Sequence, residues 1–385
     1  MSVVVPRGFS ANGVACGIKP DGAKDLALVA AEGLVTTAAV FTRSRTASPS
    51  VLLSRERVAS GTATGVILNS GCANAGTGEA GMEASERMAA AAAGALDVDE
   101  RSVLVCSTGP IGSVLPVDRV SAAVPSLVDG LGRSDAHGLA AAEAIMTTDS
   151  IPKQALAERD GWSVGGMAKG AGMIRPDMAT MLAVLTTDAA VDGALLSSAL
   201  RSSVEVTFNS LNIDGCQSTN DTVVLMASGS SGVTPGPSEV ASAVEEVCRS
   251  LALQLAADAE GASKVVVLEV RGASSDEAAR RLGMAVADSA LVRSSFYGAD
   301  PNWGRVLGAV GVAGVPIEAS DVEISYQGTV ICAGGVGVAV DEDALSRRLE
   351  GDFTVGIAVG DGPGSATVVT TDLTPEYVVF NGERS

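Results

Sequence analysis

Short apolar runs alternate along this chain with glycine-containing polar turns and with longer helical patterns. Runs of strand length predict β-strands at Val66–Ser70, Val103–Cys106, Thr222–Met226 and Lys264–Val270. Alanine-rich or amphipathic stretches predict helices at Glu79–Leu96, Pro116–Leu131, Ala136–Met146 and Ala194–Val204. Strands that alternate with helices are typical of sheets covered by helices, so the pattern predicts an α/β fold.

The pattern changes near residue 272. Ser274–Ser289 predicts a helix with acidic residues in its first turn, and Asp300–Arg305 predicts a turn that leads into another helix. Short strands with glycine-rich turns are then expected as far as Phe380. We therefore expect a first domain over residues 1–274 and a smaller carboxy-terminal α/β domain over residues 275–385.

One stretch, Met167–Asp188, changes character in its middle. Its first half is polar and contains glycines and Pro176, which disfavour a helix and favour a shaped turn. From Thr180 onward it is a short apolar run that predicts a buried strand. A threonine at the entry of a core strand, with Lys169 in the preceding loop, indicates a functional site.

Composition narrows the class of protein. The 385 residues are 46% hydrophobic and 18% charged, which is typical of a globular protein with a substantial core. The formal net charge of −19 argues against nucleic-acid binding, because attraction to phosphate requires a basic face. No secretory signal pattern opens the chain and no apolar run reaches about 18 residues. We therefore expect no membrane span and a cytoplasmic location.

Cysteine and histidine usage weigh against metal chemistry. The six cysteines are scattered without paired spacing, which favours buried thiols in a reducing compartment over a metal or disulfide site. His137 is the single histidine, whereas catalytic zinc usually takes two or more. No nucleophile turn lies near His137 to form a Ser-His-Asp triad. We expect neither a metal nor a cofactor.

A threonine hydroxyl is a weak nucleophile and needs a proton acceptor beside it. Without a nearby histidine, that base can be a lysine, a carboxylate or an α-amino group. An α-amino group has a pKa of about 7.7–8.0, which suits neutral pH. Thr180 would carry one only if the Ala179–Thr180 bond were cut, and a glycine- and proline-bounded loop can bring its hydroxyl to the preceding carbonyl. The opposing interpretation makes Thr180 an ordinary strand residue of a binding or structural protein.

Acyl transfer also requires hydrogen-bond donors for a developing oxyanion. The turn Cys106–Gly112 follows a predicted strand and offers the Thr108 hydroxyl and the Gly109 amide, the last N–H before Pro110. Such a turn by itself is more often an ordinary loop. Other small polar turns lie at Asn69–Gly76, Met146–Asp149, Asn212–Gly215 and Asp258–Gly261.

These motifs resemble those of the ornithine acetyltransferase family of arginine biosynthesis, also called the glutamate N-acetyltransferase or bifunctional ArgJ family. Lys169–Leu182 resembles the family's self-cleavage motif almost throughout. Further motifs appear in the family's order and at about its spacing, at Ser107–Gly112, Ile145–Asp149, Ala259–Ala262 and Asp300–Arg305. The resemblance extends from Pro6–Phe9 to Tyr377–Asn381. It implies an α-β-β-α sandwich that is similar to amino-terminal-nucleophile hydrolases but differs in connectivity.

By resemblance, the precursor cuts itself between Ala179 and Thr180 into an α chain of residues 1–179 and a β chain that begins at residue 180. Thr180 then accepts the acetyl group, while Thr108 and Gly109 stabilise the oxyanion. The substrate-binding positions carried over from the family are Thr147, Lys169, Thr180, Glu260, Asn381 and Ser385. The tail after Asn381 is shorter than is usual in the family, so Ser385 is matched there by position in the tail.

The implied reaction is a ping-pong transfer in which Thr180 takes an acetyl group from N2-acetyl-L-ornithine and L-glutamate then removes it. Lys169 suits the substrate carboxylate, and Glu260 suits a cationic side chain or an incoming amine. No residue decides whether acetyl-coenzyme A is a second donor. The family also implies associated α and β chains in an α2β2 or larger assembly. The alternative enzyme is a self-processed aminopeptidase or amidohydrolase of the related superfamily.

Overall fold

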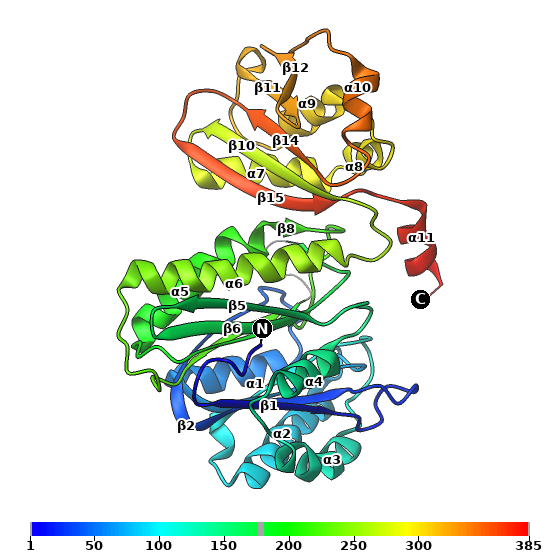
Figure 1. The fold of residues 1–385 in the computed structure, drawn as a ribbon. Coiled ribbons are helices and arrows are strands. Elements are labelled where there is room, and N and C mark those ends of the chain that lie inside the picture. The colour runs from blue at the N-terminus through cyan, green and yellow to red at the C-terminus, as the bar shows by residue number, and fades with distance from the viewer. Residues whose placement is uncertain (1, 176–180, 384–385) are drawn as a thin grey trace. The chain divides into compact units, whose positions relative to one another are not determined.

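The structure is a computed structural model that describes residues 2–175 and 181–383. These residues form two compact units, each built on its own sheet (Figure 1). The first unit comprises residues 2–173, 181–208 and 217–255, and the second comprises residues 174–175, 209–216 and 256–383. The boundary expected from the sequence, between residues 274 and 275, differs from this grouping. The reason is that β10 (Val265–Ala273) pairs with β14 and β15, which follow it in the chain, and so belongs to the second unit.

In the described part of the first unit, eight strands form one hydrogen-bonded sheet in the order β4-β3-β2-β9-β7-β6-β5, with β1 paired to β2. The strands are β1 (Phe9–Val14), β2 (Leu26–Phe41), β3 (Thr62–Asn69), β4 (Val103–Ser107), β5 (Lys153–Arg159), β6 (Trp162–Lys169), β7 (Leu182–Thr187) and β9 (Thr222–Ala227). The helices are α1 (Pro49–Arg57), α2 (Gly78–Leu96), α3 (Val117–Asp129), α4 (Asp135–Ile145), α5 (Gly193–Val206) and α6 (Pro237–Ala257).

This sheet is folded into two facing layers. Lys169, at the end of β6, donates a hydrogen bond to Thr108, directly after β4, at 3.1 Å. Four strands separate β6 from β4 in the sheet order, and a flat sheet would hold them roughly 24 Å apart at about 4.8 Å per strand. Strand β2 makes the bend, because its first half pairs with β1 and β3, and its second half pairs with β9 after a register shift between Ala30 and Val35.

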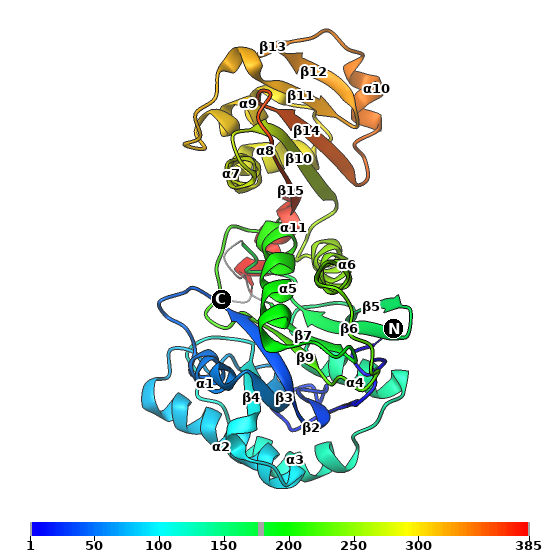
Figure 2. The ribbon, with the colours of Figure 1, turned by 90° about the vertical axis from the view of Figure 1, so that its left-hand side faces the viewer.

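Helices cover the outer face of each layer, which confirms the α-β-β-α sandwich (Figures 1 and 2). Helices α2 and α3 share one apolar cluster with the outward side chains of β2, β3 and β4. Helix α6 covers β6 so closely that a Cβ on Gly166 would lie 2.8 Å from Val247. Between the layers, a second cluster joins inward side chains of β3 and β4 to those of β7 and β9, for example Leu104 and Val184.

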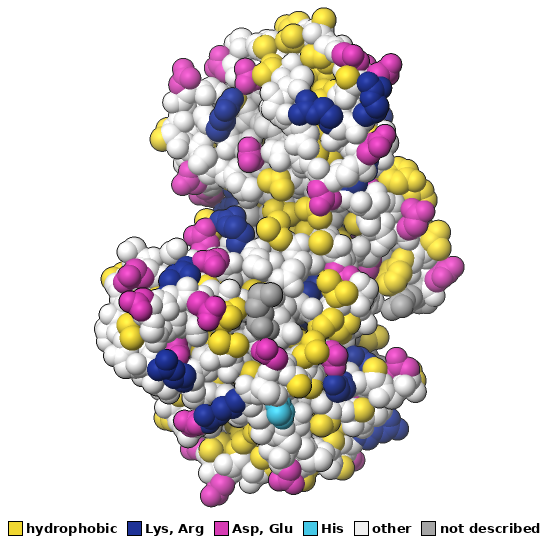
Figure 3. Space-filling view, in the orientation of Figure 1, with side chains coloured by type: hydrophobic (Ala, Val, Ile, Leu, Met, Phe, Trp, Pro, Cys, Tyr) yellow, Lys and Arg dark blue, Asp and Glu magenta, His cyan; other side chains and the backbone are white. Residues whose placement is uncertain are grey.

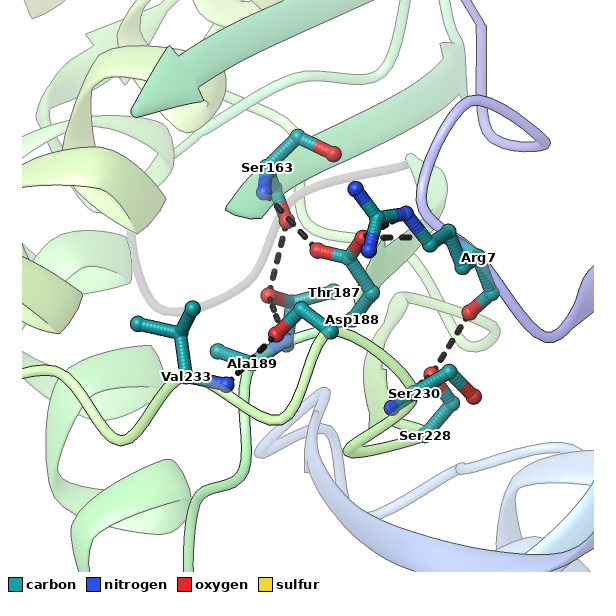
Figure 4. A network of polar contacts seen from close by, with 9 residues as sticks. Arg7, Ser163, Thr187, Asp188, Ala189, Ser228, Ser230 and Val233 are labelled. Atoms are coloured by element: carbon teal, nitrogen blue, oxygen red, sulfur yellow. Dashed lines mark hydrogen bonds and ion pairs between the residues drawn. The ribbon is translucent and has the colours of Figure 1, made fainter. Parts of the chain in front are cut away.

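Strand β7 confirms the buried strand predicted after the polar loop. Every residue of β7 is buried, and the strand pairs in parallel with β9 and antiparallel with β6. Its carboxyl end is fixed by polar contacts (Figure 4). Asp188, which is 3% exposed, accepts hydrogen bonds from the backbone N–H of Ser163 at 2.8 Å and of Arg7 at 3.3 Å. The Thr187 hydroxyl donates to the Ser163 carbonyl at 2.8 Å, so the strand register is fixed at this end.

The second unit holds a seven-stranded sheet in the order β13-β12-β11-β14-β10-β15-β8 among its described residues. Beside β10, the strands are β8 (Leu211–Asn212), β11 (Glu323–Tyr326), β12 (Thr329–Ala333), β13 (Val336–Gly337), β14 (Phe353–Ala358) and β15 (Gly364–Thr371). The helices are α7 (Asp276–Asp288), α8 (Ala290–Tyr297), α9 (Trp303–Gly311), α10 (Glu342–Arg347) and α11 (Pro375–Gly382). Its core is one apolar cluster. In this cluster the rings of Phe296 and Phe353 meet edge to face, with their centroids 5.4 Å apart.

The expected elements match the structure in most places. The predicted helices at 79–96, 116–131, 136–146, 194–204 and 274–289 correspond to α2, α3, α4, α5 and α7, and the Asp300–Arg305 turn leads into α9. The expectation of strands as far as Phe380 is wrong at its end, because residues 375–382 form helix α11. Thr374 begins that helix by accepting the Tyr377 N–H at 3.1 Å, and Pro375 occupies its first turn, where no N–H is needed.

The surface carries charge of both signs. On the face drawn in Figure 3, Lys and Arg side chains lie singly among Asp and Glu on each unit, and no basic patch gathers there. This distribution agrees with the strongly negative net charge. Within the described ranges, no helix is long and apolar enough to cross a membrane.

Candidate active site

Two polar turns that are distant in the sequence pair with each other in the first unit. The Cys72 N–H donates to the Thr108 carbonyl at 2.9 Å, and the Ala73 N–H donates to the Pro110 carbonyl at 3.1 Å. The Asn220 side chain bridges both turns through its Nδ2, which donates to the Ala73 and Ser107 carbonyls at 2.7 and 2.8 Å. The turn after β4 is therefore held from two sides, as an oxyanion site requires.

Gly109 occupies a position that only glycine can fill. Its φ of +134° lies outside the region that other residues favour, and an added Cβ would lie 2.5 Å from both the Cys72 nitrogen and the Gly71 carbonyl carbon. Gly109 is half-buried, and its N–H donates no hydrogen bond to any of the described residues. The backbone thus presents a donor that the fold leaves unused.

Thr108 and Lys169 meet in the interior of the first unit. Thr108 is 3% exposed and Lys169 is 2% exposed. The Lys169 Nζ donates to the Thr108 Oγ1 at 3.1 Å. Because the hydroxyl accepts this bond, its own proton remains available to a third group. The contact places a hydroxyl donor, a backbone donor and an ammonium group at one turn.

Asp149 connects Lys169 to Thr147. Its Oδ1 accepts the Gly170 N–H at 2.6 Å and the Lys153 Nζ at 2.7 Å, and its Oδ2 accepts the Thr147 N–H at 2.9 Å. Burial alone would raise the pKa of Asp149, but the cations of Lys169 and Lys153 and the Gly170 N–H outweigh it and lower the pKa to about 2. Asp149 is therefore ionised at neutral pH and orders the loop from which Thr147 comes.

Asp221 is a second buried carboxyl whose pKa is affected by the positive charge of Lys169. It is 0% exposed, and its Oδ1 accepts the Met181 N–H at 3.0 Å. Burial raises the pKa of Asp221 well above its ordinary value, and the Met181 N–H and the Lys169 cation lower it only in part. The first unit thus holds two buried carboxyls near the same lysine, and their pKa values are shifted in opposite directions.

The structure places the predicted residues in three groups. Thr108, Gly109, Thr147 and Lys169 come together in the first unit, directly or through Asp149. Glu260 and Asn381 belong to the second unit. Ala179, Thr180 and Ser385 lie outside the described residues.

Within the second unit, the Glu260 turn is attached to helix α11, which carries Asn381. The Thr374 hydroxyl donates to the Gly261 carbonyl at 2.5 Å, and a Cβ on Gly261 would lie 2.4 Å from the Tyr377 nitrogen. Asn381 is exposed and donates through its Nδ2 to the Tyr377 carbonyl at 3.1 Å. These two predicted substrate positions are therefore close in the fold although about 120 residues separate them.

Sequence reasoning missed Lys153, Asn220 and Asp221. The signal for the last two was present, because the polar run Gln217–Asp221 leads directly into the apolar strand β9. The same change from polar loop to buried strand singled out Met167–Asp188. Lys153 carried no such signal, since an ion pair with Asp149 within a buried cluster depends on tertiary contacts.

Together these groups can stabilise negative charge on an oxygen atom. The Thr108 hydroxyl and the Gly109 N–H are donors, and Lys169 adds positive charge in a buried setting where electrostatic interactions are stronger than in water. Burial raises the pKa of Asp221 and so disfavours its charged form, whereas Asp149 keeps a low pKa beside the cations of Lys153 and Lys169. Such a site suits an acyl group passing through a tetrahedral intermediate, or a substrate carboxylate.

Comparison with known proteins gives one consistent result. The ArgJ family model matches residues 10–385. The arginine biosynthesis bifunctional protein ArgJ of Thermobifida fusca (strain YX) is 46% identical over 387 aligned positions, which cover 100% of this chain and 100% of that protein.

Two solved structures are also similar. One is the arginine biosynthesis bifunctional protein argJ from Bacillus halodurans, with 31% identity, a TM-score of 0.51, and coverage of 55% of this chain and 100% of that chain. The other is an ornithine acetyltransferase from Mycobacterium tuberculosis complexed with ornithine, with 42% identity, a TM-score of 0.45, and coverage of 47% of this chain and 95% of that chain.

Proposed function

Because this chain belongs to the ArgJ family and is an acetyltransferase of arginine biosynthesis, we propose that it moves an acetyl group from N2-acetyl-L-ornithine to L-glutamate. The acetyl group is carried as an ester on Thr180 in a ping-pong cycle. Ornithine leaves before glutamate enters and attacks the ester.

One observation carries this proposal: the hydrogen bond from Lys169 to Thr108 beside the unused Gly109 N–H. Two donors and a buried ammonium group lie at one turn, and this arrangement supports a site that stabilises a tetrahedral oxyanion. The lysine at one end of this arrangement begins the loop that leads to Thr180, and strand β7 begins two residues after Thr180. The described residues that follow Thr180, from Met181 through β7, are buried in the first unit, which supports this assignment.

Thr180 becomes a competent nucleophile when the chain is cut before it. The Thr180 hydroxyl attacks the Ala179 carbonyl carbon, the C–N bond breaks, and water hydrolyses the resulting ester. The products are the Ala179 carboxylate and a free Thr180 amine, which then accepts the proton of the Thr180 hydroxyl during acetyl transfer. The Bacillus halodurans comparison supports a two-piece protein, since the whole solved chain matches 55% of this one, whereas the Thermobifida fusca sequence matches all of it.

Substrate recognition follows from the charges of the substrate. Lys169, with its positive charge next to Thr108, suits the substrate carboxylate, and Thr147 is held beside it by Asp149. We assign the cationic side chain of ornithine, or the incoming amine of glutamate, to Glu260. Asn381 and Ser385 complete the proposed set of substrate contacts.

Three wider features belong to the same proposal. The name of the Thermobifida fusca relative includes the word bifunctional, and acetyl-coenzyme A is the second acetyl donor to test. The α and β chains stay associated after cleavage, as an α2β2 or larger assembly. The reaction takes place in the cytoplasm.

The test begins with the purified full-length product. We expect denaturing electrophoresis to show two fragments, and amino-terminal sequencing of one of them to begin at Thr180. Incubation with N2-acetyl-L-ornithine, followed by intact-mass measurement, should add one acetyl group to the fragment that begins at Thr180. Adding L-glutamate should remove that group and release N-acetylglutamate.

The matched variants are Thr180→Ala and Thr180→Ser. Thr180→Ala should remain one uncut, inactive polypeptide, and Thr180→Ser should still be cut because serine keeps the hydroxyl. A Thr180→Ala variant that fragments at the same bond contradicts self-processing by Thr180. Release of acetate instead of acetylglutamate would indicate a hydrolase.

A further inference from the structure

Asp221 has a contact that none of the roles above explains. Its Oδ1 accepts the N–H of Met181, which directly follows Thr180 in the chain. Its Oδ2 is buried and accepts no hydrogen bond within 3.5 Å from residues 2–175 and 181–383, although the Ser218 hydroxyl and N–H lie near enough to lower the pKa of the carboxyl. A fully buried carboxyl with one unpaired oxygen is costly to the folded state, so its presence calls for a reason.

The contact lies at the end of β7 nearest to Thr180. The ladder pairs of β7 begin at Leu182, which pairs with Lys169 of β6 and with Thr222 of β9. Met181 precedes this ladder, and its two backbone groups are paired separately. Its N–H donates to Asp221 at 3.0 Å, and its carbonyl accepts the Thr222 N–H at 3.1 Å. The Asp221 side chain therefore extends the hydrogen-bonded order by one residue toward Thr180.

We propose that Asp221 is a positioning residue for Thr180, and that its carboxyl holds the Met181 amide so that the main chain is ordered up to the residue after the nucleophile. This inference rests on the proposed function, in which Thr180 becomes a chain terminus. After the cut, Thr180 is joined to the protein only through Met181. New termini fray unless they are fixed by hydrogen bonds or packing, and the Met181 amide is the first group that can fix this one.

The neutral state matters because of the neighbouring charges. Lys169 is the cation whose charge reaches both Asp149 and Asp221. The low pKa of Asp149 lets it offset positive charge, whereas burial raises the pKa of Asp221 and favours its neutral form. A neutral carboxyl can be replaced by an amide of the same shape, which keeps the acceptor oxygen and a donor. An ionised carboxyl acting as a base cannot be replaced in this way.

The experiment compares Asp221→Asn and Asp221→Ala in the full-length chain. Self-cleavage is followed during cell-free synthesis by denaturing electrophoresis, and kcat and KM for acetyl transfer are measured on the cut protein. Loss of one buried hydrogen bond corresponds to a change of about tenfold in a rate or equilibrium constant. We expect Asp221→Ala to slow cleavage and lower kcat by about that factor with little change in KM. Asp221→Asn should restore both rates to within about threefold of the wild type.

Asp188→Ala is the matched control for stability. Asp188 is also a buried carboxyl that accepts backbone N–H groups, but it lies at the opposite end of β7, beside Ser163 and Arg7 (Figure 4). We expect Asp188→Ala to lower the thermal unfolding midpoint at least as much as Asp221→Ala. Its folded fraction should nevertheless cleave and transfer at wild-type rates.

Several results would overturn the inference. If Asp221→Asn is as slow as Asp221→Ala, the carboxyl acts in its ionised form and the neutral positioning role is wrong. If Asp221→Ala cleaves and transfers at wild-type rates, or if Asp188→Ala is equally slow, Asp221 contributes stability alone. A wild-type chain that stays intact contradicts the proposed function itself, whereas a cut wild type with unaffected Asp221 variants contradicts only this inference.

Discussion

Replacing Gly109 by alanine tests the proposed oxyanion site through the backbone, without removing any functional side chain. The φ of Gly109 is +134°, a region that costs a residue with a Cβ about 1–3 kcal/mol. The new Cβ would also lie 2.5 Å from the Cys72 nitrogen and the Gly71 carbonyl carbon. Ordinary contacts are roughly 3.5–4.0 Å, so the two paired turns must separate by about 1 Å.

A displacement of that size is large for an oxyanion donor. A misplacement of about 1 Å can cost about a hundredfold in rate, and loss of one oxyanion donor costs about 10²–10³ in kcat. We therefore expect Gly109→Ala to lower kcat for acetyl transfer by about a hundredfold or more. KM for N2-acetyl-L-ornithine should change much less, because Lys169 and Thr147 are not held by the Gly109 amide.

Gly112→Ala separates backbone strain from displacement of the donor. Gly112 has a φ of +98°, but a Cβ there meets no atom within 4 Å. Both variants should lose stability from the unfavourable backbone conformation, measured as the urea unfolding midpoint. Only Gly109→Ala should lose the rate of single-turnover acetylation, measured by rapid-quench mass spectrometry of the Thr180 fragment. Equal acetylation rates in the two variants would refute the assignment of Gly109 as an oxyanion donor.

Two further predictions concern Asp149 and Gly261. The folded-state pKa of Asp149 is about 2, which is below the unfolded value of about 3.9. The ionised carboxylate therefore adds about 2 kcal/mol to the free energy of unfolding above about pH 4, and this stabilisation is lost as the pH falls toward 2. Asp149→Asn should remove that part of the pH dependence of urea unfolding; an unchanged acid profile would contradict it. Gly261→Ala should raise KM more than it lowers kcat, because a Cβ would lie 2.4 Å from the Tyr377 nitrogen and displace α11. Gly328→Ala is the control, because Gly328 also has a positive φ but an added Cβ there meets no atom within 4 Å. Equal KM values in the Gly261→Ala and Gly328→Ala variants would contradict the assignment of the Glu260 turn and α11 to substrate binding.

The functional residues differ in how far local sequence could reveal them. Thr108 and Gly109 were found because a glycine and a proline after an apolar run mark a shaped turn. Thr147, Lys169, Glu260 and Asn381 were assigned by resemblance, and the structure shows how Thr147 and Lys169 are connected through Asp149. Asp221 was missed because its role depends on a contact with Met181, and no periodicity reports a contact between two strands.

The elements that were missed or misassigned each have their own explanation. Strand β2 is long and bends at a register shift, so its pattern does not keep one face inward throughout. Helix α6 was missed, although its Pro-Ser-Glu start is a recognisable beginning for a helix. The last helix, α11, was predicted as strand because its valines and aromatic residues favour strands, and its Thr374 cap decided otherwise.

The sequence by itself determined that this is an α/β protein, that a polar loop precedes the buried strand β7, and that a glycine- and proline-containing turn follows β4. These features follow from local chemistry, since glycine, proline and apolar runs restrict the nearby backbone. Only the tertiary structure decided that β4 and β6 face each other, because the sheet folds over at β2. That fold brings Lys169 to Thr108, lowers the pKa of Asp149 and raises that of Asp221, since pKa values depend on burial and on charges that are distant in the sequence.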